Sequence, residues 1–167
     1  PSLELNDKIE SLNIFTHIAE INVSKNNFDT ASVYFQKAFA QIEPGSSEVE
    51  ILNAPDPKFL QMKKVYYITN LMIAKGDAYR KRYTSTGNKQ FLNEALHVYR
   101  RTDQFLDLLR REQTDSESKL FWRKDIRRLY EHAIDACFGA QDESSAFYFF
   151  EKSRAASDSR PCTGKSD

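Results

Sequence analysis

The stretch ASVYFQKA, residues 31–38, places a small residue, an aromatic residue four positions later and a second small residue three positions after that, at Ala31, Phe35 and Ala38. The same spacing returns twice, at Ala95, Tyr99 and Thr102 and at Ala146, Phe150 and Ser153. Steps of four and three residues put the three side chains of a set on one face of an α-helix. Small residues let neighbouring helix backbones approach closely, and the aromatic ring fills the groove between them. The stretch therefore predicts paired helices and not a reactive site.

Each set follows an upstream pattern of large and small apolar residues, clearest at Phe15, Ile18, Ala19 and Asn22 and at Tyr130, Ala133, Ile134 and Cys137. Helical periodicity is broken at turn residues, which predicts six helices. We expect them over residues 6–24, 27–42, 58–83, 89–112, 114–139 and 142–156. Paired in order, they form hairpins over residues 6–45, 58–112 and 114–156. The prediction is an all-α domain over residues 1–156 and a disordered tail over 157–167, which contains Ser157, Ser159, Ser166, Gly164 and Pro161.

Composition agrees with a helical chain. Gly and Pro number five each among 167 residues, which disfavours a fold made of strands and tight turns. The formal net charge is zero, but residues 61–130 carry 16 basic and 8 acidic side chains, while the segments on both sides are acidic. Cys137 and Cys162 are the only cysteines, and no apolar run approaches the length of about 18 residues that crosses a bilayer. We therefore expect a protein of the cytoplasm, without a structural disulfide.

The paired patterns resemble the tetratricopeptide repeat, a helix-turn-helix unit of 34 residues. In the first copy Phe15 stands in the place of the family tryptophan, and Ile18 and Ala19 stand in the place of its leucine-glycine pair. The second copy has Gly76 in the glycine place, but its two halves lie further apart than the family spacing. The third copy keeps the spacing and has Ile134 in the glycine place. The resemblance implies a right-handed superhelical stack of three antiparallel hairpins.

Residues 130–155 are similar to the repeat array that precedes a CHAT domain, a caspase-like peptidase module. In such proteins the array senses a partner or regulates the module, and the catalytic residues lie outside the array. The resemblance implies a protein-interaction scaffold, the regulatory segment of a larger CHAT-type protein. Its partner would be another protein, a peptide or the downstream domain of the same protein. The alternative is a structural spacer that binds nothing in trans.

In tetratricopeptide arrays the first helix of each hairpin lines a concave groove, and its residues off the packing stripe are available for binding. The resemblance places these positions at Asn13, Thr16, His17, Glu20, Asn70, Ile73, Asp77, Arg80, Arg128, Glu131 and Asp135. Arg80 and Arg128 would contact anions, and Glu20, Asp77 and Asp135 would contact cations. The set mixes both charges and lacks the Lys and Asn clamp with which some arrays hold a peptide carboxylate. A groove of this kind would suit a segment of mixed charge.

Other function classes are less favoured. His17, His97 and His132 are far apart in the sequence and have no metal-ligand spacing, while Cys137 stands where the repeat has a packing side chain. We therefore expect no catalytic residues, metal or cofactor. The basic clusters within residues 80–128 alternate with acidic side chains, whereas phosphate recognition needs a continuous positive stripe. Nucleic-acid binding is thus less favoured than a scaffold or a spacer.

Four consecutive aromatic residues at 147–150 point in four directions on a helix, so they cannot all face one core. We expect Ala146 and Phe150 to pack within the third hairpin. Phe147 or Phe149 would then cover the surface that a following helix would use. An exposed apolar patch there would allow a homodimer.

Overall fold

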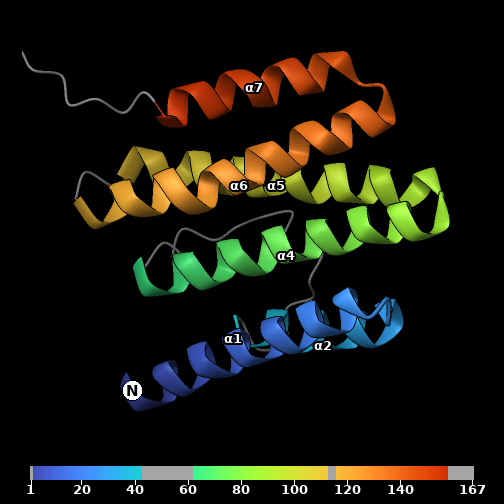
Figure 1. Ribbon diagram of the computed structural model, residues 1–167. Coiled ribbons are helices and arrows are strands. Elements are labelled where there is room, and N and C mark those ends of the chain that lie inside the picture. Colours follow the sequence, from blue (N-terminus) through green and yellow to red (C-terminus); the bar gives the residue numbers. More distant parts are fainter. Residues whose placement is uncertain (1, 43–61, 113–115, 158–167) are drawn as a thin grey trace, which may run out of the picture. The chain divides into compact units, whose positions relative to one another are not determined.

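The computed structural model describes residues 2–42, 62–112 and 116–157, and these residues are helical apart from short turns (Figure 1). Six helices lie within them: α1 (Ser2–Ser24), α2 (Phe28–Ala40), α4 (Met62–Thr86), α5 (Lys89–Glu112), α6 (Ser116–Ala140) and α7 (Glu143–Ser157). The all-α prediction is confirmed. Residues 43–61, 113–115 and 158–167 lie outside the described part of the chain, and with them the predicted acidic linker, the capping box at Thr114 and nearly all of the predicted tail.

The chain divides into two compact units, residues 1–112 and residues 113–167. In the first unit α1 packs against α2, α4 packs against α5, and α4 also contacts both α1 and α2. In the second unit α6 packs against α7. The three predicted helix pairs are therefore present. The right-handed superhelix stays a prediction.

The first and third hairpins close with the same turn, 115 residues apart. Asn26 and Gln141 adopt left-handed backbone angles, with φ of 60° and 57°. The next amide N–H, of Asn27 or Asp142, donates to the carbonyl five residues earlier at 2.9 Å, which satisfies the end of the first helix. The second helix then begins with a hydrogen bond of 3.0 Å, which the amide of Ala31 donates to the Asn27 carbonyl and the amide of Ala146 to the Asp142 carbonyl. The alignment of copies one and three is correct at this turn.

An aromatic pair also repeats inside these two hairpins. The rings of Phe15 and Tyr34 lie 6.2 Å apart at an angle of 38°, and the rings of Tyr130 and Phe149 have the same separation and angle. Phe149, not Phe150, is therefore the α7 residue that packs within the third hairpin, and the prediction for Phe150 is wrong. The proposal that Phe149 belongs to an exposed patch is wrong for the same reason, because its ring is fully buried.

The second hairpin turns over fewer residues than predicted. The hydroxyls of Thr84 and Thr86 donate to the carbonyls four residues earlier, which lets α4 continue through a segment rich in turn residues. Gly87 then takes a φ of 68°, and the Asn88 side chain accepts the amide N–H of Gln90 as an N-cap of α5. The turn is thus confined to Gly87 and Asn88.

A close approach between helix and ring fixes the pairing of α4 with α5. A Cβ atom at Gly76 would lie 2.5 Å from Cε1 of Tyr99, so only glycine leaves room for this ring. Tyr99 is fully buried, and its hydroxyl donates to the Asp77 carboxylate at 2.6 Å. Gly76 therefore lets the α4 backbone approach an aromatic ring closely, which is the role that the sequence pattern predicts for small residues.

Candidate functional site

The predicted groove residues fall into two classes by exposure. Thr16 is fully buried and donates its hydroxyl to the Leu12 carbonyl at 2.8 Å, and Ile73 is buried as well. Both lie on helix faces that the packing of α1, α2, α4 and α5 removes from solvent. The prediction that these two residues line an open groove is therefore wrong.

The remaining groove residues reach solvent to different degrees. The exposed residues among them are His17, Glu131 and Asp135. The partly buried ones are Asn13, Glu20, Asn70, Asp77, Arg80 and Arg128. Several already have intramolecular partners. His17 Nδ1 lies 3.1 Å from the Glu20 carboxylate, and the Arg127 guanidinium donates to Glu131 at 2.8 Å.

The groove residues belong to both units. Those on α1 and α4 lie in the first unit, whereas Arg128, Glu131 and Asp135 lie on α6 in the second. Asp77 accepts the Tyr99 hydroxyl, so this carboxylate also positions a core ring. A common groove across the predicted residues stays a prediction.

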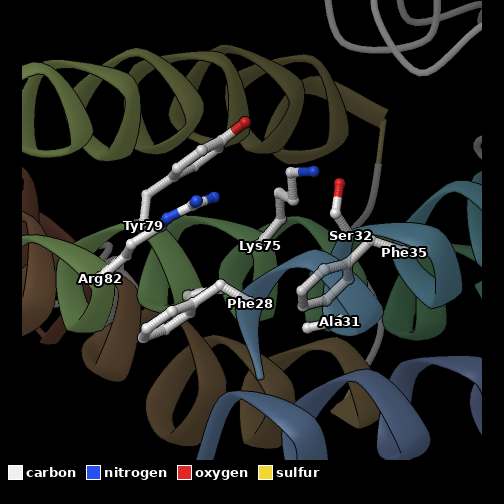
Figure 2. Close-up of a pocket in the computed structure, with 8 residues that line it drawn as sticks. Phe28, Ala31, Ser32, Phe35, Lys75, Tyr79 and Arg82 are labelled. Atoms are coloured by element: carbon white, nitrogen blue, oxygen red, sulfur yellow. The ribbon is translucent and has the colours of Figure 1, made fainter. Parts of the chain in front are cut away.

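A pocket that the sequence analysis did not identify lies between α2 and α4 (Figure 2). Its volume is about 60 Å³, and its lining residues are Phe28, Ala31, Ser32, Phe35, Lys75, Ala78, Tyr79 and Arg82. The members on α4 are spaced by three, four and seven residues, which places them on one helix face. Three of the lining residues are aromatic and two are cationic.

Both cations of the pocket lie against aromatic rings. Lys75 is only 5% exposed, and its Nζ atom lies 5.3 Å from the ring centre of Phe35 and 5.2 Å from that of Tyr79. The Arg82 guanidinium lies 5.6 Å from the ring centre of Phe28 and 4.4 Å from that of Phe91. The electron-rich faces of aromatic rings attract cations without carrying a net negative charge. These ring contacts help to place the two basic groups at the pocket walls.

A second feature is the exposed aromatic face of α7. The turn and the ring pair show that the first and third hairpins correspond with an offset of 115 residues. Ala31 therefore corresponds to Ala146, Ser32 to Phe147 and Phe35 to Phe150. Phe35 is 1% exposed because α4 packs on this side of α2, whereas Phe147 and Phe150 are 67% and 51% exposed. The two helices thus present equivalent faces, and α4 covers the one on α2. We call Ala146, Phe147 and Phe150 the α7 face.

The described residues offer neither a metal cluster nor a membrane span. Among them no three His, Cys, Asp or Glu side chains come together in a way that would bind a metal ion. Cys137, the cysteine of α6, is buried. No helix in the described ranges combines the length and the apolar character that a membrane span requires.

The chain was also compared with known proteins. No protein-family model, curated protein or solved structure matches it. The tetratricopeptide and CHAT resemblances therefore stay predictions from the residues quoted above.

The pocket residues on α4, which the sequence analysis did not identify, do have a signal in the sequence. Lys75, Ala78, Tyr79 and Arg82 form a stripe of small, aromatic and basic side chains at helical spacing on one predicted helix. That stripe gives no sign of Phe28, which lies more than 40 residues earlier and completes the pocket. Only the packing of α2 on α4 brings the two together.

Proposed function

We propose that this chain is a protein-interaction scaffold of the tetratricopeptide type and that the α7 face receives an amphipathic helix. That helix would come from a partner protein or from another domain of the same protein, such as a CHAT-type module. The observation that carries the proposal is the equivalence of Phe150 and Phe35. One of these rings is covered by a helix within the chain, and the other is half exposed.

The energetic argument follows from the exposed rings. Burying a phenylalanine side chain fully contributes about 1.5–3 kcal/mol, so covering Phe147 and Phe150 would contribute roughly 2–4 kcal/mol after the part already buried is discounted. Adjacent exposed apolar side chains of this size are characteristic of interaction surfaces. The α7 face is therefore suited to another helix packed as α4 packs on α2.

The internal interface also indicates the chemistry of the incoming helix. At the end of the interface, Phe28 of α2 packs on Arg82 of α4. The residue equivalent to Phe28 on α7 is Glu143, an exposed carboxylate. A helix with a small and aromatic stripe, and with a basic residue opposite Glu143, would complement both the apolar and the charged parts of the face.

A labelled peptide of residues 62–86, the sequence of α4, is a direct probe of this surface. We expect saturable binding to the full chain, measured by fluorescence anisotropy, and at least about tenfold weaker binding to Phe150→Ser because about 1.5 kcal/mol of burial is lost. Phe138→Ser is the matched control, since Phe138 is an exposed ring on α6 that lies outside the α7 face.

The outcomes separate scaffold from spacer. If the peptide binds wild type and Phe138→Ser alike but Phe150→Ser weakly, the α7 face is the docking surface. Equal loss in both variants would place the contact elsewhere, and the absence of any binding would favour the structural spacer. Circular dichroism of each variant checks that the helices are retained.

A further inference from the structure

The pocket between α2 and α4 has a lining of one charge sign. Two of the eight lining residues are basic, and none is an aspartate or glutamate. Arg82 does contact the Asp29 carboxylate, at 3.5 Å, but the Asp29 side chain is 97% exposed. An ion pair of this length that is exposed to solvent contributes little to stability. Because Asp29 compensates the charge of Arg82 only weakly, Arg82 favours an anion at its end of the pocket.

The arrangement of polar atoms points to a small planar anion. In Figure 2 the Arg82 guanidinium extends along the pocket from one end, and the polar ends of Lys75 and Ser32 lie at the other. A guanidinium offers paired N–H donors that match the two oxygens of a carboxylate. α2 begins at Phe28, next to Arg82, so the partially positive end of this helix lies at the same end of the pocket.

The aromatic walls restrict what can carry this anion. Phe28, Phe35 and Tyr79 offer apolar surface to the methylene groups of a side chain, while the volume of about 60 Å³ accommodates only a small group. A glutamate has both parts, a short aliphatic stem and a terminal carboxylate. An aspartate has the same chemistry with one methylene fewer.

We propose that this pocket binds the carboxylate side chain of a glutamate or aspartate in an acidic peptide segment, with Arg82 as the main anion contact and Lys75 as the second. The site shares no residue with the α7 face or with the predicted groove. It gives the scaffold a second point of recognition that depends on charge.

A displayed library of random linear peptides, selected on the full chain, provides the probe. We expect selected peptides to share a Glu or Asp at one position. Synthetic versions of one peptide, with Glu or with Gln there, are then measured by isothermal titration. The Gln peptide should bind at least about tenfold more weakly, since hydrogen bonds to charged groups are the strong ones.

Variants connect this loss to the pocket. Arg82→Gln should weaken the Glu peptide by a similar factor and leave the Gln peptide unchanged, because the two changes remove the same interaction. Arg101→Gln, which removes an equal charge from α5 outside the pocket lining, should leave both affinities unchanged. Lys75→Met keeps an unbranched apolar stem in the buried position and should also weaken the Glu peptide.

Each of the following results would overturn the assignment of the pocket. They are a library without acidic enrichment, a Gln peptide that binds as tightly as the Glu peptide, and an Arg101→Gln effect as large as that of Arg82→Gln. If selected peptides lose binding in Phe150→Ser but not in Arg82→Gln, the scaffold proposal stands and the pocket assignment fails. The two proposals can therefore fail independently.

Discussion

Replacing Gly76 by alanine tests the packing of α4 on α5 most directly. The new Cβ atom would lie 2.5 Å from Cε1, 2.8 Å from Cδ1 and 3.1 Å from Cζ of Tyr99. The ring cannot retreat freely, because it is fully buried and its hydroxyl is bonded to Asp77 at 2.6 Å. Either the helices separate slightly or the ring shifts and strains this bond.

The expected loss can be worked out from opposing terms. Overpacking a well-packed interior costs about 1–3 kcal/mol, and weakening a hydrogen bond to a carboxylate adds about 1 kcal/mol. Alanine in a helix interior offsets about 1 kcal/mol of this because it has a higher helix propensity than glycine. The net prediction is a loss of about 1–3 kcal/mol in the free energy of unfolding, or a fall of at least about 2 °C in Tm.

Urea unfolding followed by circular dichroism measures this quantity. The informative background is Tyr99→Val, which removes all three ring atoms that the new methyl group would meet. In that background Gly76→Ala should be neutral or stabilising by up to about 1 kcal/mol, so the sign of the effect should change. If the alanine costs as much in the Tyr99→Val background as in the wild type, or costs nothing in the wild type, the close approach is not what requires glycine.

Three further predictions concern α7 and a turn. Phe149→Ala should cost about 3–5 kcal/mol in urea unfolding, whereas Phe150→Ala should stay within about 0.5 kcal/mol, and the reverse order would contradict the assignment of the two faces. Gly87→Ala should cost about 1 kcal/mol because of its positive φ, although open space surrounds the site, and unchanged thermal stability would argue against that strain. The predicted homodimer, corrected to exclude Phe149, should weaken in Phe147→Ser when measured by sedimentation equilibrium, and an unaffected association constant would remove α7 from the contact.

Local signals predicted most of the fold. The bounds of α5 agree with the predicted 89–112, because Asn88 is a good N-cap and an amphipathic stripe follows it. α4 runs three residues past its predicted end at Tyr83, since the Thr84 and Thr86 hydroxyls bond back to the helix instead of stopping it. Asn27 occupies the N-cap position of α2 as expected, yet its side chain makes no capping bond.

The errors concern which of two neighbouring aromatics faces which helix. Tyr34 and Phe35 in the first hairpin, and Phe149 and Phe150 in the third, are adjacent rings about 100° apart on a helix. Spacing alone does not say which ring packs within the hairpin and which packs on the next helix. The neighbouring helix decides this, and for the same reason the burial of Thr16 could not be deduced from its own position.

The shared turn of the first and third hairpins has a consequence for folding kinetics. Because α1 joins α2, and α6 joins α7, through only two or three residues, their contacts are local in sequence. Local contacts have a small entropic cost of chain closure, and chains rich in them fold fast. We expect these two hairpins to form early and independently, and the same holds for α4 and α5, which are joined by only Gly87 and Asn88. The docking of α4 on α1 and α2, which must bridge the separation from Ala40 to Met62, would follow as the slower step.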